Sequence, residues 1–202
     1  ANILTPFNKF VTKKIEEVVK LNLPIDYICT SHGVVWRDNP LQIVQKYAEW
    51  ANNYQENQIT LIYDTMYNGT HTIAENIAKG IMLADKSITV KLYNAGKMDK
   101  NDILTEVFKS KAILMGSPTV NNRMMYATTG LLEMIKGLKF VNKKAAAFGT
   151  YGWNDMASKQ IDKLLREAGF DVVLEPLSNN WEPSADMLAQ CVEYGKKLVS
   201  LL

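Results

Sequence analysis

The 202-residue chain is 47% hydrophobic and 22% charged, as is usual for a globular protein. Its net charge of +2 is too small to indicate a nucleic acid or a membrane surface as partner. The sequence has no apolar stretch long enough to span a bilayer and no signal-peptide pattern. Two cysteines are too few for a disulfide framework or a zinc site. We therefore expect a soluble protein in a reducing compartment, the cytoplasm.

The first 56 residues form a segment of their own. Residues 6–21 have the periodicity of an amphipathic helix, residues 25–29 that of a strand, and residues 40–50 that of a second helix. A polar linker, residues 52–57, follows. A helix, a strand and a helix bury too little surface to fold alone, so we expect a remnant of a truncated domain. The chain begins with Ala1 and not with Met, which we interpret as processing or cutting.

From Ile59 to the end, apolar runs alternate with stretches of helical periodicity, which is typical of a parallel sheet covered by helices on both faces. The predicted strands are residues 59–63, 88–93, 112–116, 144–149 and 172–177. The predicted helices are residues 72–84, residues 102–110, a helix through Leu131 to Gly137, residues 156–168, and a last helix opened by Pro183 and Ser184. The expected fold is α/β, a doubly wound five-stranded parallel sheet of order 2-1-3-4-5 after a short α-β-α remnant.

The helical periodicity also predicts which side chains are buried. In the first helix of the sheet region the apolar residues recur every four positions: Ile73, Ile77 and Ile81. The last helix is expected to bury Leu188, Val192 and Leu198. The two cysteines, Cys29 and Cys191, lie on apolar faces, so we expect buried small hydrophobic residues and no redox role.

Three loops indicate a binding site. Ligands of an open α/β sheet bind beyond the carboxyl ends of the strands, where the strand order reverses. In the order 2-1-3-4-5 this point lies above the first and third strands, with the fourth beside them. The loops after these three strands, residues 64–70, 117–122 and 150–154, are rich in hydroxyls, amides, glycine and aromatic rings. The loops after the second and fifth strands have nothing comparable.

The loop after the first strand leads directly into a helix, whose N–H groups and dipole form an anion site. Thr65 and Thr70 add hydroxyl groups, and Gly69 allows the backbone to approach a ligand closely. Residues 64–72 contain no Lys or Arg and only one glycine, so the loop lacks the patterns that bind nucleoside triphosphates or dinucleotides. A neutral cradle of this kind suits the terminal phosphate of a mononucleotide. The alternative is a helix N-cap and turn without a ligand.

The loop after the fourth strand carries two aromatic residues. Tyr151 and Trp153 flank Gly152 and could stack on a planar ring, while Gly152 and Asn154 offer polar groups to its edge. The alternative is that Trp153 packs onto the following helix.

The three loops resemble those of flavodoxins, in the same order along the chain. Residues 65–70 resemble the phosphate loop, with Asn68-Gly69 where many flavodoxins have Gly-Asn, and residues 116–119 and 148–153 resemble the two loops around the isoalloxazine ring. The resemblance covers about residues 58–202 and implies a flavodoxin-like FMN-binding domain at residues 57–202. The FMN-binding residues that it implies are Thr65, Met66, Tyr67, Asn68, Gly69, Thr70, Ser117, Pro118, Thr119, Val120, Asn121, Asn122, Thr150, Tyr151, Gly152 and Trp153.

Residues 28–37, followed by a helix and then a flavodoxin-like domain, resemble the domain junction of flavodiiron proteins. In that family a metallo-β-lactamase-like domain holds two irons and reduces oxygen or nitric oxide. The resemblance implies that residues 1–56 are the C-terminal remnant of such a domain, and that His32 matches its last iron-ligating histidine. One histidine cannot hold a di-iron centre, so this metal site is incomplete here. The alternative for His32 is a turn residue without a ligand.

The resemblance also implies a function. FMN would pass electrons from rubredoxin or a rubredoxin reductase to the di-iron site of an oxygen or nitric oxide reductase, a homodimer or homotetramer at full length. This chain would be the flavin half, with no catalytic acid, base or nucleophile of its own. Three alternatives stay open: a free-standing electron-carrier flavodoxin, a flavin-dependent NAD(P)H quinone reductase, and a binding module without redox activity.

Overall fold

The computed structural model describes residues 3–202, which divide into two compact units, residues 3–54 and residues 55–202. The smaller unit contains η1 (Thr5–Phe7), α1 (Asn8–Lys20), β1 (Ile28–Cys29), β2 (Val35–Trp36) and α2 (Leu41–Ala51). β1 and β2 form an antiparallel hairpin where the sequence predicted a single strand. β2 is only two residues long, too short for a periodic pattern. Among the described helices, none combines the length and the hydrophobicity needed to cross a membrane.

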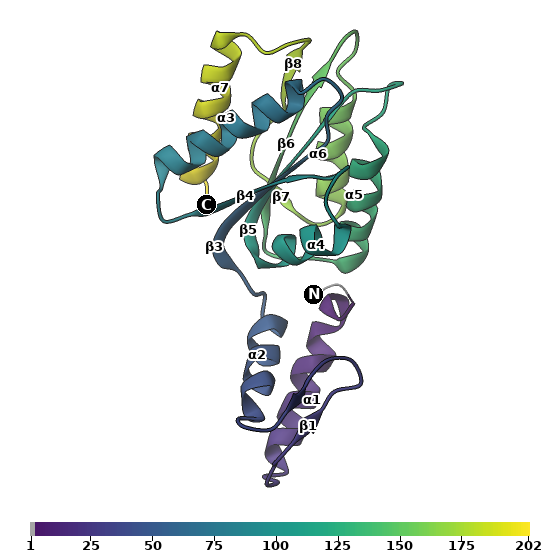
Figure 1. The fold of residues 1–202 in the computed structure, drawn as a ribbon, viewed down its shortest axis with the longest axis vertical. Coiled ribbons are helices and arrows are strands. Elements are labelled where there is room, and N and C mark those ends of the chain that lie inside the picture. The colour runs from purple at the N-terminus through teal and green to yellow at the C-terminus, as the bar shows by residue number, and fades with distance from the viewer. Residues whose placement is uncertain (1–2) are drawn as a thin grey trace. The chain divides into compact units, whose positions relative to one another are not determined.

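The larger unit is built on a parallel sheet in the order β4-β3-β5-β6-β7, with β8 also paired to β6 (Figure 1). Its strands are β3 (Glu56–Tyr63), β4 (Thr89–Asn94), β5 (Ser110–Pro118), β6 (Lys144–Tyr151), β7 (Asp171–Val172) and β8 (Leu177–Asn180). The predicted parallel arrangement and the order 2-1-3-4-5 are confirmed.

The predicted fifth strand is divided into β7 and β8, which both pair with β6. Pro176 lies in the break and has no N–H to donate to the ladder. The hydroxyl of Tyr194 lies 2.9 Å from the carbonyl oxygen of Glu175, beside the break, and 3.2 Å from that of Ala147 in β6. A side chain therefore ties the interrupted segment to the sheet where the backbone cannot.

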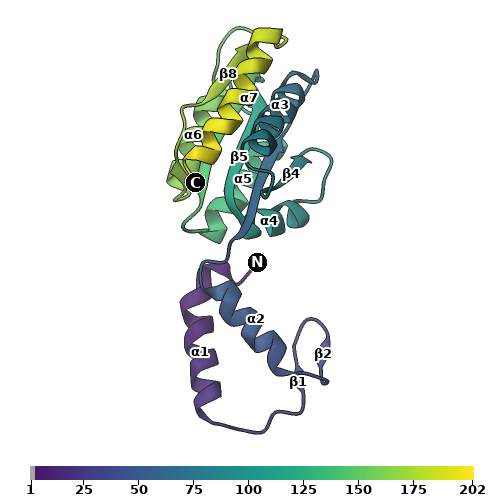
Figure 2. The ribbon, with the colours of Figure 1, turned by 90° about the vertical axis from the view of Figure 1, so that its left-hand side faces the viewer.

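Five helices cover the two faces of the sheet. α3 (Gly69–Ala84) and α7 (Ala185–Ser200) lie on one face, and α4 (Lys100–Lys109), α5 (Tyr126–Leu138) and α6 (Ala157–Glu167) lie on the other (Figures 1 and 2). The predicted inner side chains of α3 are fully buried: Ile73, Ile77 and Ile81. They pack with Ile59 and Leu61, alternate residues of β3, as the two-residue period of a strand requires.

The buried face of α7 is displaced from the predicted one. Leu198 is buried as expected, but Leu188 and Val192 are only partly covered, and the helix buries Met187 and Cys191 instead. The displacement follows from small residues that bring α7 close to α3. Cys29 is exposed, so the prediction that both cysteines are buried is wrong for this one.

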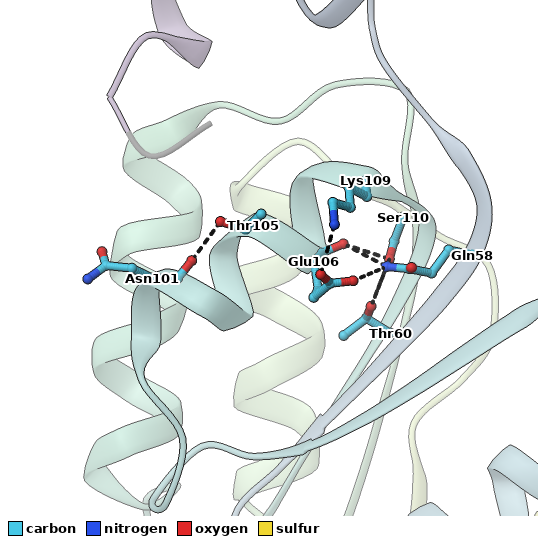
Figure 3. Close-up of polar contacts among 7 residues, drawn as sticks. All are labelled: Gln58, Thr60, Asn101, Thr105, Glu106, Lys109 and Ser110. Atoms are coloured by element: carbon cyan, nitrogen blue, oxygen red, sulfur yellow. Dashed lines mark hydrogen bonds and ion pairs between the residues drawn. The ribbon is translucent and has the colours of Figure 1, made fainter. Parts of the chain in front are cut away.

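A polar cluster holds α4 against the amino-terminal ends of β3 and β5 (Figure 3). Gln58, Thr60 and Ser110 are buried. The Gln58 amide donates to the carboxylate of Glu106 at 2.8 Å and to the hydroxyl of Ser110 at 3.1 Å. Lys109 forms an ion pair with Glu106 at 3.1 Å. Because these polar groups satisfy one another, the polar side chains of Gln58 and Thr60 can be buried in β3.

α3 and α7 cross with their backbones in contact. A Cβ atom at Gly80 would lie 2.0 Å from the carbonyl oxygen of Val192, and one at Gly195 would lie 2.2 Å from that of Ile77. Both obstacles are backbone atoms, so no side chain can turn aside to admit a methyl group. The crossing therefore requires glycine at both positions.

We predict that Gly80→Ala or Gly195→Ala lowers the free energy of unfolding by about 1–3 kcal/mol, because either methyl group forces the two helices apart. Gly130→Ala, in α5, is the matched control. A Cβ atom there meets nothing within 4 Å, so alanine should raise the stability by about 0.4–1 kcal/mol. Urea denaturation of the three variants measures the difference, and equal stabilities would contradict the close crossing.

Candidate functional site

The carboxyl ends of the parallel strands lie level at one edge of the sheet. Tyr63 is paired with Gly116, Gly116 with Phe148, and Phe148 with Leu177, so one row of residues crosses β3, β5, β6 and β8. The loops that leave these strands begin within a few residues of this row. The three predicted loops therefore lie at one edge, beside the point where the strand order reverses.

Thr150 joins the three loops directly. Its hydroxyl is hydrogen-bonded to that of Thr70 at 2.8 Å, which links the loop after β6 to the start of α3. Its carbonyl oxygen accepts the N–H of Thr119 at 2.8 Å, which links the same loop to the loop after β5. Thr70 is buried. The structure thus brings the predicted site together through hydrogen bonds between its own parts.

The loop after β3 is shorter than predicted, because α3 begins at Gly69 and not at Thr72. Asn68 adopts a left-handed φ of 66°, and its carbonyl oxygen accepts the N–H of Thr72 at 2.9 Å, the first bond of the helix. Gly69 and Thr70 therefore belong to the first turn, whose N–H groups have no acceptor within the helix. Met66 and Tyr67 are exposed at the rim.

One hydroxyl of this loop is ready for a ligand. The Thr65 Oγ1 atom is buried and has no hydrogen-bond partner among the described residues. A buried hydroxyl without a partner costs free energy, and an anion at the N-terminus of α3 would supply an acceptor for it. The residues present therefore fit a phosphate group.

Asp64 is the other unusual polar group at this edge. It is 4% exposed, and its Oδ1 atom accepts the N–H of Thr65 at 2.9 Å, while Oδ2 has no partner among residues 3–202. Burial raises the pKa of the Asp64 carboxyl, and the Thr65 hydrogen bond lowers that pKa by less. The carboxylate is therefore poorly stabilised where it stands.

In the loop after β5, the two hydroxyls that were predicted to bind a ligand form hydrogen bonds within the protein. Ser117 and Pro118 are the last residues of β5, and the buried Ser117 hydroxyl donates to the Pro118 carbonyl and accepts the N–H of Met125, both at 2.9 Å. The Thr119 hydroxyl accepts the N–H of Met156 at 3.2 Å and of Ala157 at 3.0 Å. It caps α6, whose own N-cap residue makes no side-chain cap bond.

The rest of this loop is a tight turn. Val120 and Arg123 exchange two backbone hydrogen bonds, at 2.8 and 2.9 Å, around Asn121 and Asn122. The two asparagines have φ values of 50° and 59°, and positive φ at both central residues is the mark of a type I′ turn. The Asn122 carbonyl also accepts the amide of Gln160, from α6, at 3.0 Å. The turn is therefore fixed in place.

In the loop after β6, Thr150 and Tyr151 still belong to the strand, and Gly152 and Trp153 leave it. Trp153 is 87% exposed and meets the indole of Trp181 edge-on, with ring centroids 5.3 Å apart and planes at 73°. Its exposure argues against the alternative that it packs onto the following helix. The indole is free to contact a ligand.

The sequence reasoning missed the loop after β8. The amide of Asn180 donates to the carbonyl oxygens of Gly152 at 2.6 Å and Tyr151 at 3.3 Å. The backbone N–H of Trp181 donates to the Tyr151 carbonyl at 2.8 Å. The prediction that the loop after the fifth strand has nothing comparable to the three loops is wrong. The available signal was two asparagines and a tryptophan at residues 179–181, which lie in the loop predicted between residue 177 and Pro183.

The two histidines belong to different units, His32 to the smaller and His71 to the larger. His32 is exposed between β1 and β2, and within residues 3–202 no cluster of three or more His, Cys, Asp or Glu could hold a metal ion. His71 is partly buried, with its ring stacked on Tyr63 at 4.9 Å and 3.4 Å from the carboxylate of Glu75. A metal role for His32 stays a prediction.

Comparisons with known proteins agree with this geometry. The sequence profile of the family described as Flavodoxin matches residues 61–195. An anaerobic nitric oxide reductase flavorubredoxin from Vibrio vulnificus is 51% identical over 201 residues, 100% of this chain and 40% of that protein. The chain thus spans about two-fifths of the length of the curated relatives that it matches.

Two solved structures are similar over nearly the whole chain. The rubredoxin oxygen:oxidoreductase of Desulfovibrio gigas has a TM-score of 0.92 and 31% identity, covering 99% of this chain and 50% of that one. The flavodiiron protein of Giardia intestinalis has a TM-score of 0.91 and 28% identity, covering 98% and 49%.

The raised pKa of Asp64 predicts a pH-dependent stability. The folded state holds the Asp64 proton to a higher pH than the unfolded state, so the favourable contribution is complete below the ordinary carboxyl pKa and is lost as the pH rises through the folded value. We therefore expect Asp64→Asn to stabilise the flavin-free protein at pH 7 and to lose this advantage near pH 3, measured by urea denaturation.

Asp85→Asn is the control with the opposite sign. The hydroxyl and N–H of Ser87 hold the pKa of the exposed Asp85 carboxyl below its usual value. Its stabilising contribution is therefore present at neutral pH and lost on acidification through the folded value, and Asp85→Asn should destabilise the protein at pH 7. The same pH trend in both variants would contradict the assignment for Asp64.

Proposed function

The chain belongs to the flavodoxin family, and from this premise we propose that residues 57–202 bind FMN non-covalently where the loops after β3, β5 and β6 meet. The observation that carries the proposal is the buried, unpartnered hydroxyl of Thr65 beside the first turn of α3. A phosphate there would accept from this hydroxyl and from the free N–H groups of the helix.

The phosphate site consists of residues 65–70. Thr65 supplies its hydroxyl, while Gly69 and Thr70 supply backbone N–H groups at the positive end of the helix dipole. The bond from Thr70 to Thr150 sets the distance between this cradle and the loop after β6. Residues 64–72 contain no Lys or Arg, so the site relies on N–H and O–H donors.

The isoalloxazine ring lies between residues 117–122 and residues 150–153 in this proposal. The hydroxyls of Ser117 and Thr119 are used within the protein, so that loop offers its backbone, the Pro118 ring and the turn at 120–123. The exposed indole of Trp153 stacks on the ring. FMN, when bound, supplies the one- and two-electron chemistry, and the protein binds, orients and shields it.

We further propose that the chain is the FMN half of a flavodiiron oxygen or nitric oxide reductase, which passes electrons from a rubredoxin-type donor to a di-iron site. Its support is the relatives: one is named a nitric oxide reductase flavorubredoxin, another a rubredoxin oxygen:oxidoreductase. The parent protein is proposed to be a cytoplasmic homodimer or homotetramer, and the two free cysteines accord with a reducing compartment.

An apolar groove in the smaller unit supports the proposal that this unit is part of a larger domain. Its helices and hairpin leave an apolar groove of about 790 Å³, whose lining includes Phe7, Phe10, Val18, Tyr27, Ile43 and Tyr47. Several of these side chains are largely exposed, Phe10 by 68% and Tyr27 by 65%. We propose that residues 1–56 are the C-terminal part of a metallo-β-lactamase-like domain, whose remaining residues would cover the groove, and that His32 is one of its iron ligands.

The phosphate site predicts a difference between two flavins. Thr65→Val should weaken FMN binding about 10- to 100-fold, because a hydrogen bond to a charged group is lost, and should leave riboflavin binding unchanged. Thr105→Val is the control, since that hydroxyl is exposed on α4 and donates to the Asn101 carbonyl (Figure 3). Fluorescence titration gives the dissociation constants. Equal affinity of the wild-type chain for FMN and riboflavin would contradict the phosphate site.

The flavodiiron proposal predicts the metal content of the full-length gene product. It should contain two irons and one FMN per chain and reduce oxygen or nitric oxide with electrons from reduced rubredoxin. His32→Ala should lower the iron content and this activity without loss of FMN. A full-length protein that binds FMN but no iron would end the flavodiiron proposal and leave FMN binding standing.

A further inference from the structure

Trp181 has a backbone conformation that a bulky residue rarely adopts. Its φ is 60°, in the left-handed region that favours glycine. Three hydrogen bonds hold this conformation. The backbone N–H of Trp181 donates to the Tyr151 carbonyl, and the side-chain amide of Asn179 donates to the Trp181 carbonyl at 2.9 Å. The side-chain amide of Asn180 donates to the Gly152 carbonyl. Such a conformation persists only where the surroundings impose it, and it is frequent at functional sites.

The conformation places the Trp181 indole against the loop after β6. A Cβ atom at Gly152 would lie 3.0 Å from Trp181 Cη2, so a side chain at position 152 would crowd the indole. The same indole meets Trp153 edge-on, with centroids 5.3 Å apart. Gly152 therefore admits the ring that lies beside Trp153.

The same residue also reaches the phosphate site. The carbonyl oxygen of Trp181 lies 3.8 Å from the position of a Cβ atom on Gly69, the first residue of α3. The loop after β8 thus contacts the loop after β6 and lies near the start of α3, although Trp181 is itself 60% exposed.

We propose that Trp181 is a positioning residue, whose indole holds Trp153 at the angle at which it stacks on the flavin ring. The inference rests on the proposed function of this site. A single exposed tryptophan would sample several rotamers, and an edge-to-face partner restricts it to one. Trp181 acts through Trp153. The left-handed backbone of Trp181 places its indole beside that of Trp153.

The test is a double-mutant cycle of Trp153→Ala and Trp181→Gly. Glycine adopts the left-handed conformation without strain, so the variant keeps the turn and should fold. Trp181→Gly alone should weaken FMN and riboflavin binding by the same factor, about three- to tenfold, because the ring and not the phosphate is affected. In the Trp153→Ala background it should have no further effect.

Near-ultraviolet circular dichroism of the flavin-free chain provides a readout apart from binding. Two indoles in edge contact give a coupled signal, which either single substitution should abolish, whereas Trp36→Phe in the smaller unit should leave it in place. Trp181→Phe keeps an aromatic edge against Trp153 and should restore most of the affinity for both flavins.

Three results would overturn the inference. One is additive losses in the cycle, which would mean that Trp181 acts independently of Trp153. Another is normal flavin binding by Trp181→Gly, and the third is a loss confined to FMN. All three presume a wild-type chain that binds FMN. A wild-type chain that binds no flavin would instead overturn the proposed function and this inference with it.

Discussion

The parallel register of the sheet is the constraint on which the proposed site depends. Because β3, β5, β6 and β8 are aligned through Tyr63, Gly116, Phe148 and Leu177, their loops must leave the sheet at the same level. A parallel sheet is stable only when both of its faces are covered, and five helices meet that requirement. The hydrogen bonds of Thr150 then fix the loops to one another.

Many polar groups at this edge serve the protein before they serve a ligand. Thr119 caps α6, and Ser117 accepts the N–H of Met125 at the start of α5. Asn180 donates a hydrogen bond to the Gly152 carbonyl. These contacts remove rotational freedom from the loops, so binding a flavin would cost less ordering entropy. Among the described residues, the hydroxyl of Thr65 and the Oδ2 atom of Asp64 at this edge have no partner, and the Thr65 hydroxyl is the one that could donate to a phosphate. The backbone of Trp181 is strained, at a cost of about 1–3 kcal/mol.

The order of elements and the sheet topology could be predicted from the sequence, because strands buried on both faces are apolar runs and helices such as α3 have a clear 3.6-residue period. The three loops of the site could be predicted for the same reason, since their place follows from topology. The sequence could not predict whether a hydroxyl faces a ligand or caps a helix, as Thr119 shows. That choice depends on α6, whose own cap residue makes no side-chain bond. The contribution of Trp181 could not be predicted, because it depends on a left-handed backbone and on an edge contact with Trp153, which no sequence pattern shows.

The contact between Gly80 and Gly195 has a consequence for the order in which the protein matures. It joins the first helix of the larger unit to its last, across most of that unit's sequence. Contacts so distant along the chain form late, because the intervening polypeptide must first be made and closed into a loop. On the ribosome, α3 lacks its neighbour until α7 emerges. The packing of α3 therefore forms only after α7 has been made, and we expect cofactor capture by the cradle at its N-terminus to follow the synthesis of that helix.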